Sequence, residues 1–218
     1  MLRGIRLVIY DLDGTLIDSS EAIVEVFNRV VVELGEKELP KAVIEEMIGL
    51  PYDEAFRRVL PEAKHGMVPW CWERYREMYS ELAPSKTRIL LGAEEALAHF
   101  KMLGLKQSVA TLKHSDVASK ILGGLGLLPY FDLVLGINDA VNPKPASDVI
   151  ELTLTRLQVE PREAVFVEDT AILLEAGKKA GVYTVGVTTG TDDREKLATH
   201  SPDYIVNGLR ELTLLISP

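Results

Sequence analysis

The sequence is poor in cysteine, glutamine and asparagine. Its 218 residues include one cysteine, Cys71, two glutamines and four asparagines. A single thiol excludes an internal disulfide framework and fits a reducing compartment, where a cysteine usually packs as a small apolar side chain. The scarcity of both amides weakly indicates a heat-adapted source. We therefore expect Cys71 to be buried and the protein to be cytoplasmic.

Long apolar runs and blocks of like charge are also missing. No stretch approaches the roughly 20 apolar residues of a membrane-spanning helix, and charge interrupts the first apolar run too early for a signal peptide. The net charge is −9, whereas nucleic acids and anionic lipids are bound by clustered lysine and arginine. We expect neither partner, and either a monomer or a homodimer.

The sequence lacks internal repeats and a dinucleotide-binding fingerprint. Its glycine cluster, GGLGLL at 123–128, does not have the G-x-G-x-x-G spacing after a strand, so we expect these glycines to serve helix packing. Apolar residues make up 47% of the chain, which is ordinary for a globular protein. This length allows one sizeable core with a smaller appendage.

Short apolar runs of strand length recur along the chain, and most do not alternate with polar residues. Continuous runs of this kind indicate strands covered on both faces, as in a parallel sheet. The runs lie at 5–10, 108–112, 133–136, 164–168, 183–189 and 203–207. Helical patterns lie between them at 92–104, 120–127, 148–157 and 171–180, the last followed by Gly181 as a C-cap. The sequence therefore predicts an α/β fold with a doubly wound, mostly parallel sheet.

One connection is far longer than a crossover requires. About a hundred residues separate the first strand from the second, where a dozen or more suffice. A helical stripe from Ala22 to Leu34 begins after Asp18, the expected N-cap, and ends at Gly35. A second stripe, which we expect to form a small core, carries Val68, Trp72, Tyr75, Tyr79 and Leu82. We therefore expect a helical cap at 17–87, inserted into a core domain of 1–16 and 88–218.

Residues able to do chemistry follow several of the predicted strands. Ligands of open α/β sheets bind at the carboxyl ends of the strands, so side chains at these positions should converge. The candidates are Asp11 and Asp13 after the first strand, Thr111 near the end of the second, Lys144 after the third, and Glu168 and Asp169 after the fourth. The simpler alternatives are an acidic turn, a plain strand end, a surface lysine and a helix N-cap at Asp169.

Carboxylates gathered at one edge need a cation. Two carboxylates about 4 Å apart repel by about 4 kcal/mol at an effective dielectric constant near 20. Oxygen ligands with room for water favour Mg²⁺ over Zn²⁺, and the four histidines lack metal-ligand spacing. Acids, a divalent metal, a lysine and a threonine together suit a phosphoryl group, whose oxygens need positive charge and hydrogen-bond donors during transfer.

The sequence resembles the haloacid dehalogenase superfamily of phosphohydrolases. The motif DLDGTL at 11–16, Thr111, the region of Lys144 and the segment VED at 167–169 match its four motifs in order. The helical insertion resembles the small cap of phosphoglycolate phosphatase and its relatives. This sequence has a second aspartate, Asp13, two residues after Asp11, whereas the dehalogenases themselves do not resemble this pattern. The resemblance therefore implies phosphate-ester chemistry and disfavours dehalogenation.

The resemblance also implies a role for each matching residue. Asp11 would be the nucleophile that forms an aspartyl-phosphate and a Mg²⁺ ligand, and Asp13 the acid and base. Thr111 would hold a phosphate oxygen, and Lys144 would stabilise the nucleophile and the transferred group. Glu168 and Asp169 would complete the metal site, to which we also assign Asp13.

Two positions differ from the family pattern. Many members carry an acid or a glycine where this chain has Leu173, so one outer metal contact or the local turn is in question. Lys113 follows Thr111 where relatives often have small or amide residues. A solvated lysine is the simpler expectation for Lys113, and a substrate-binding side chain is the alternative. Arg58 in the cap is a further substrate-binding candidate, against a solvated helix face.

The leading hypothesis is a Mg²⁺-dependent phosphatase of a small phosphorylated metabolite, with phosphoglycolate as the first candidate and sugar phosphates or pyrophosphate still open. A phosphomutase shares the aspartyl-phosphate and returns the phosphoryl group to a sugar. A catalytically weak phosphate-binding protein and a signalling receiver domain, which also groups Asp, Thr and Lys at strand ends, are the alternatives outside enzymology.

Overall fold

The computed structural model describes residues 1–217 and divides into two compact units. The first unit comprises residues 1–18 and the chain from Arg88 onward, and the second is Ser19–Thr87. The sequence analysis places the corresponding boundaries after residue 16 and after residue 87. The second unit is thus a single insertion into the first.

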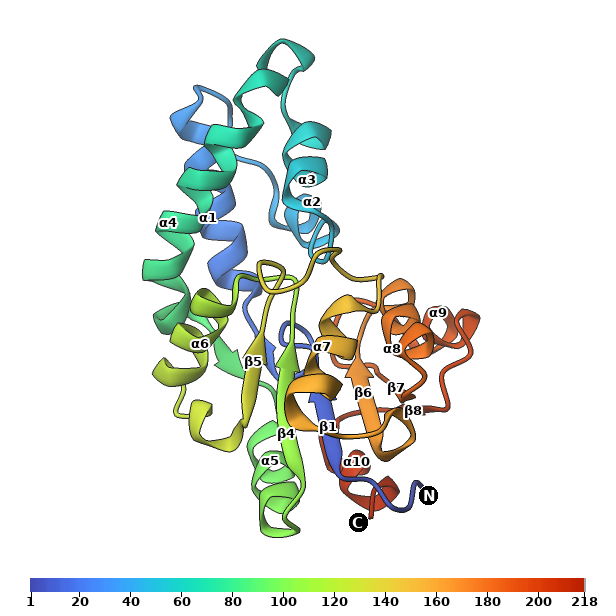
Figure 1. Cartoon of the computed structure of the whole chain (residues 1–218). Helices are drawn as coiled ribbons and strands as arrows, with labels where there is room; N and C mark the ends of the chain where they lie inside the picture. The colour runs from blue at the N-terminus through green and yellow to red at the C-terminus, as the bar shows by residue number, and fades with distance from the viewer. Residues whose placement is uncertain (218) are drawn as a thin grey trace. The chain divides into compact units, whose positions relative to one another are not determined.

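The first unit is built on a six-stranded parallel sheet of strand order β5-β4-β1-β6-β7-β8 (Figure 1). The central strand β1 (Leu7–Tyr10) lies between β4 (Lys106–Ala110) and β6 (Ala164–Glu168). The outer strands are β5 (Leu133–Leu135), β7 (Tyr183–Val187) and β8 (Tyr204–Val206). All six predicted strands are confirmed. The second begins earlier than expected, at Lys106, because it pairs in register with Leu7 of β1.

Helices cover both faces of this sheet, as the alternation of side chains along β1 shows. Leu7 and Ile9 pack in one apolar cluster with Val149 and Ile150 of α7 (Asp148–Leu157). On the opposite face of the sheet, the Tyr10 hydroxyl donates to the side-chain oxygen of Gln107. The side-chain amide of Gln107 in turn donates to the Leu97 carbonyl of α5 (Ala93–Met102). The remaining helical segments are α6 (Ser115–Gly124), η2 (Leu128–Tyr130), η3 (Pro161–Glu163), η4 (Ala171–Leu173), α8 (Leu174–Ala180), α9 (Arg194–Thr199) and α10 (Leu209–Leu215). These two covered faces make the unit the doubly wound α/β fold that the sequence predicts.

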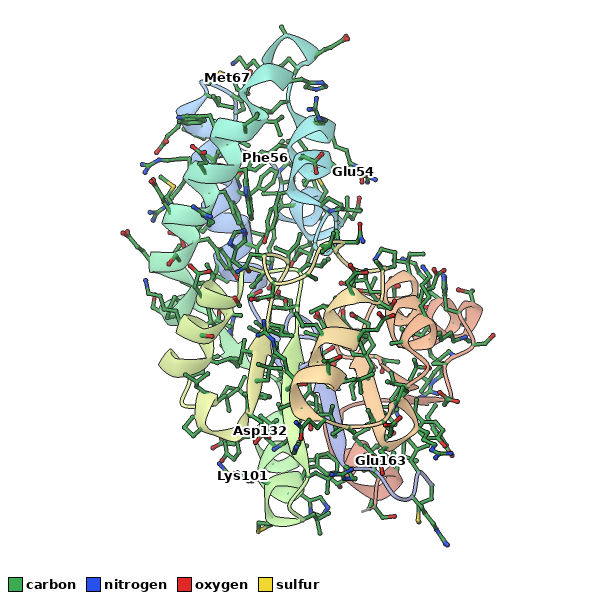
Figure 2. All side chains as sticks on the ribbon, in the orientation of Figure 1. Glu54, Phe56, Met67, Lys101, Asp132 and Glu163 are labelled. Carbon is green, nitrogen blue, oxygen red and sulfur yellow. The ribbon has the colours of Figure 1, made fainter. Side chains whose placement is uncertain are left out.

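The second unit is helical and has an aromatic core. Its elements are α1 (Ser20–Glu33), α2 (Lys41–Glu45), α3 (Tyr52–Val59), η1 (Glu62–Met67) and α4 (Val68–Lys86). Phe56 lies between the helices of this unit (Figure 2), fully buried, and stacks on Phe27 with ring centroids 4.4 Å apart. Cys71 is buried, as expected. No helix within residues 1–217 has both the length and the apolar character needed to cross a bilayer.

Three details differ from the sequence-based expectations. Asp18 is not the N-cap of α1, whose N-cap is Ser19, because Asp18 belongs to a short antiparallel ribbon of β2 (Ile17–Asp18) and β3 (Arg88–Ile89). Within the glycine cluster, Gly123 does not serve helix packing, since a Cβ there would meet nothing within 4 Å. Gly126 instead ends the helix region with a φ of 74°, a conformation that favours glycine. The helix expected at 120–127 is α6, which begins earlier, at Ser115.

The amino-terminal edge of the sheet carries polar residues that pair with one another. The Arg6 guanidinium lies 3.0 Å from the Glu163 carboxylate. The backbone amide of Gln107 donates to the Asp132 carboxylate over 2.8 Å. Lys101 lies in the last turn of α5, which leads into β4 at this edge (Figure 2). These contacts account for polar side chains at the edge opposite the strand carboxyl ends.

Candidate active site

Three buried carboxylates converge at the carboxyl ends of the two central strands. Asp11 follows β1, and its amide donates to the Val167 carbonyl of β6 over 2.9 Å. Glu168 is the last residue of β6, and Asp169 follows it. Asp11 is 6% exposed, Glu168 is fully buried and Asp169 is 2% exposed. One oxygen from each lies within 4.8 Å of the others, as the strand-end rule predicts.

Lys144 supplies the positive charge inside this group. Its ammonium lies 2.5 Å from Asp11 Oδ1 and 2.7 Å from Glu168 Oε2, and its side chain is fully buried. The ammonium also lies 5.3 Å from the centre of the Phe166 ring, within cation–π distance. The alternative of a surface lysine is therefore wrong for Lys144.

One ammonium does not compensate three buried carboxylates. Burial, and then repulsion from Asp11, raises the pKa of Asp169 to about 6. Burial likewise raises the pKa values of Asp11 and Glu168, with negative neighbours adding to the effect. Burial alone lowers the pKa of Lys144, but the charges of Asp11 and Glu168 outweigh it and raise that pKa. The site therefore has an excess of negative charge that a cation would relieve.

The donor set fits a hard divalent cation. Asp11, Glu168 and Asp169 offer oxygen atoms only, and within residues 1–217 they form the one group of at least three metal-binding side chains close enough to share an ion. Histidine and cysteine take no part in it. Carboxylate oxygens are ligands that Mg²⁺, Ca²⁺ and Mn²⁺ prefer.

The Asp169 carboxylate is held by residues that sequence reasoning missed. The Thr15 hydroxyl donates to Oδ1 over 3.2 Å and the Thr191 amide donates to Oδ2 over 2.8 Å. A Cβ at Gly14 or Gly190 would lie 2.4 Å or 2.0 Å from Oδ2, so only glycine allows this close approach. The signal for Thr191 and Gly190 is the segment TTGT after β7, one more strand carboxyl end. Asp169 is not a helix N-cap, since the residue before η4 is Thr170.

The turn after Asp169 is intact despite Leu173. The Leu173 and Leu174 amides donate to the Thr170 carbonyl over 3.0 and 3.2 Å. The Ala171 amide donates to the buried carboxylate of Asp192 over 2.7 Å. The turn is therefore closed by its own backbone and by an acid from the loop after β7.

Asp13 and Lys113 form a separate ion pair. Lys113 Nζ lies 2.7 Å from Asp13 Oδ2, with side-chain exposures of 5% for Lys113 and 18% for Asp13. The expectation of a solvated Lys113 is wrong, because its side chain is buried and pairs with the Asp13 carboxylate. The Asp13 side chain is not among the three convergent carboxylates. Its assignment as a side-chain metal ligand stays a prediction.

The other two candidates have different surroundings. Thr111 is 3% exposed, lies one residue beyond β4, and its hydroxyl accepts the Lys113 amide over 3.2 Å. Arg58 belongs to the helical unit, where it pairs with Glu54 on α3 at 2.5 Å and is 53% exposed. Within the first unit, the structure therefore gathers Asp11, Lys144, Glu168 and Asp169, with Thr111, Lys113 and Asp13 linked in a second group. Arg58 belongs to the other unit, and its assignment as a substrate-binding residue stays a prediction.

Comparison with known proteins places the whole chain among phosphatases. Residues 8–187 match the family model of haloacid dehalogenase-like hydrolases. A probable phosphatase, IndB, of Dickeya dadantii is 33% identical, with 94% of this chain and 91% of that protein covered. A phosphoglycolate phosphatase of Neisseria meningitidis is 31% identical, with 100% and 96% covered. A haloacid dehalogenase-like hydrolase of Streptococcus pneumoniae has the same fold, with a TM-score of 0.87 at 24% identity over 98% of this chain and 99% of that one.

Proposed function

Because the chain belongs to the haloacid dehalogenase-like hydrolases, we propose that it is a Mg²⁺-dependent phosphatase that works through a phosphorylated Asp11. The observation that carries this proposal is the ammonium of Lys144 between Asp11 and Glu168, beside Asp169, at the carboxyl edge of the sheet. A buried carboxylate with one such partner is held in one orientation, which a nucleophile needs. Family membership over most of the chain also excludes the receiver-domain alternative.

Each residue has a defined part in the proposed reaction. An oxygen of Asp11 attacks phosphorus, while Lys144 stabilises the negative charge on the nucleophile and on the transferred group. Asp13 gives a proton to the departing oxygen and then takes one from the water that hydrolyses the phosphorylated aspartate. Thr111, at the end of β4, holds a phosphate oxygen. Asp11, Glu168 and Asp169 would hold Mg²⁺, which supplies positive charge to the phosphoryl oxygens when bound.

The proposed substrate is a small phosphorylated metabolite, with phosphoglycolate as the first candidate. The support is the full-length similarity to a phosphoglycolate phosphatase at 31% identity. Sugar phosphates and pyrophosphate belong in the same screen. Release of inorganic phosphate separates a phosphatase from a phosphomutase, because a mutase returns the phosphoryl group to its product.

The test is a screen of phosphorylated metabolites for phosphate release, with Mg²⁺ and with a chelator. We expect Mg²⁺-dependent turnover by the unmodified protein and a loss of at least about 10³-fold in Asp11→Asn, as for removal of a nucleophile. Asp11→Asn should stay folded, because asparagine has nearly the same shape and Lys144 keeps Glu168 as a partner. Turnover retained in Asp11→Asn would remove Asp11 from the mechanism, and the absence of metal-dependent turnover on every substrate would contradict the proposed function.

A further inference from the structure

The site contains two buried lysines that divide the carboxylates between them. Lys144 contacts Asp11 and Glu168, whereas Lys113 contacts Asp13. The reaction described above uses Lys144 and gives no part to Lys113. Burying a lysine costs side-chain entropy and hydration, and exposed ion pairs contribute little, so a nearly buried pair of this kind needs a reason.

The backbone of Lys113 is fixed at several points. Its amide donates to the Thr111 hydroxyl over 3.2 Å, and its carbonyl accepts the Ile137 amide over 2.9 Å. A Cβ at Gly136, directly after β5, would lie 2.2 Å from the Lys113 carbonyl oxygen. Only a glycine at 136 therefore lets the chain after β5 approach Lys113 this closely. The lysine thus extends from a rigid base made by two neighbouring strand ends.

The backbone of Asp13 is equally constrained, while its side chain is the least buried of the four catalytic-site acids. The Gly14 amide donates to the Ile17 carbonyl over 2.8 Å and the Leu16 amide to the Leu12 carbonyl over 2.9 Å, which close the turn around Asp13. The Asp13 side chain is 18% exposed, compared with 9% for Asp11. The Lys113 ammonium, 2.7 Å from Oδ2, restricts the rotation of this carboxylate.

We propose that Lys113 is a positioning residue that aims the Asp13 carboxyl group at the leaving oxygen of the substrate. It acts through Asp13 and does not bind the transferred phosphoryl group. This inference rests on the proposed function and adds a residue to its proton-transfer step.

The step concerned is the first half of the reaction. An Asp11 oxygen forms a bond to phosphorus as the bond from phosphorus to the leaving oxygen breaks, and that electron pair stays on the leaving oxygen. The leaving oxygen takes the proton from the Asp13 carboxyl group, so an alcohol departs and Asp13 becomes a carboxylate. In the second half, Asp13 takes a proton from water as the water oxygen bonds to phosphorus and Asp11 is released from it.

In this role, the contribution of Lys113 to the rate depends on the leaving group of the substrate. An alkoxide is a strong base and departs only with a proton, whereas p-nitrophenolate departs readily without one. Positioning of the acid therefore affects alkyl phosphates and spares p-nitrophenyl phosphate. A lysine that bound the phosphoryl group would affect both substrates equally, because they share that group.

The experiment measures kcat/KM of the full chain with Mg²⁺ on p-nitrophenyl phosphate and on the best alkyl phosphate from the screen. We expect Lys113→Met to lower kcat/KM by about 10²-fold on the alkyl phosphate and by less than about threefold on p-nitrophenyl phosphate. The inhibition constant of inorganic phosphate should change by less than about twofold, since the phosphoryl site is unchanged. Lys113→Arg, which keeps the charge, should recover part of the alkyl phosphate activity.

Three further variants serve as references and control. Asp13→Asn should show the same dependence on leaving group, and Lys113→Met should have no added effect in that background, because the two residues act as one unit. The double variant also removes the carboxylate that loses its lysine partner in Lys113→Met, so it stays informative if Lys113→Met alone folds poorly. Lys101→Met, at the opposite edge of the sheet, removes an exposed lysine and should behave as the unmodified protein on both substrates.

Specific outcomes would overturn the inference. Equal losses on the two substrates, or a tenfold or greater rise in the inhibition constant of phosphate, would make Lys113 a phosphate-binding residue. Unchanged activity in folded Lys113→Met would make the pair merely structural. Failure of the proposed function is distinguishable, because the unmodified protein would then release no phosphate from either substrate.

Discussion

Gly190 shows how tightly single residues constrain the site. A Cβ at this position would lie 2.0 Å from Asp169 Oδ2, so Gly190→Ala must displace the carboxylate or the loop. We expect the variant to bind Mg²⁺ more weakly and to lose about 1–3 kcal/mol of unfolding free energy, as for other overpacked sites. Urea unfolding and calorimetric titration with Mg²⁺ measure the two effects.

The matched control for this prediction is Gly123→Ala. Gly123 lies within α6, and a Cβ there would meet nothing within 4 Å. Alanine in a helix is more favourable than glycine, so this variant should gain about 0.5–1 kcal/mol and bind Mg²⁺ unchanged. If Gly190→Ala behaved like Gly123→Ala, the close approach of Gly190 to Asp169 would affect neither the stability of the protein nor its Mg²⁺ affinity.

Residue chemistry explains which parts of the site could be predicted from the sequence. Asp11, Lys144, Glu168 and Asp169 come together because parallel strands end at one edge, a rule that needs only the strand positions. The burial of Lys113 could not be predicted in this way, because it depends on Gly136 allowing a neighbouring loop to approach. Thr15 and Thr191 were missed for a related reason, since a threonine near a strand end has many structural uses.

At the scale of elements, α3 carries the one substrate-binding candidate outside the core unit. Arg58 pairs with Glu54 one helical turn away, and such a pair contributes about 0.2–0.5 kcal/mol. If Arg58 binds substrate, Arg58→Ala should raise KM at least about tenfold with kcat unchanged, which marks the loss of uniform binding. Steady-state kinetics on the best substrate of the screen measure both constants.

Glu54→Ala is the control for Arg58→Ala, because it removes the same ion pair and keeps the guanidinium. We expect this variant to match the unmodified protein in KM. An equal rise in KM for both variants would assign the effect to the helix rather than to substrate binding. No change in either variant would leave Arg58 a solvated residue.

The elements themselves differ in how visible they are in the sequence. All six strands of the main sheet were predicted, because strands buried on both faces are continuous apolar runs. The ribbon of β2 and β3 was not, since strands of two residues have no detectable periodicity. Its absence from the prediction also explains the error at Asp18, whose place before a helix resembles an N-cap although it pairs with Arg88.

The behaviour of the whole molecule with pH follows from the acidic site. The pKa of Asp169 is about 6 in the folded, metal-free protein, against 3.8 for an ordinary aspartate. The folded state thus binds a proton more tightly than the unfolded state between these values. Protonated Asp169 therefore adds about 3 kcal/mol to the unfolding free energy at a pH well below 4. This contribution is lost as the pH rises through about 6. Mg²⁺ should restore stability at pH 7, because it binds the ionised carboxylates that the folded state gathers and the unfolded state does not.

The measurement is the unfolding free energy of chelator-treated protein between pH 4 and 8, for the unmodified chain and for Asp169→Asn. Carboxylates elsewhere titrate in the same range and cancel in the difference between the two proteins, which reports Asp169 together with the effect of its charge on Glu168. We expect that difference to shift by about 2 kcal/mol between about pH 4 and 8. Parallel curves would show that Asp169 keeps an ordinary pKa, and would weaken the argument for a cation at this site.

The ribbon that flanks the insertion has a practical consequence for engineering. Asp18 and Arg88 are direct partners in an antiparallel ladder, so the chain leaves the core and returns to it at adjacent points. An Asn-Gly dipeptide, a favoured two-residue hairpin connection, would suffice to join them. Excision of 19–87 would then leave the core unit as one uninterrupted chain, onto which insertions from relatives could be grafted to test whether they set substrate preference.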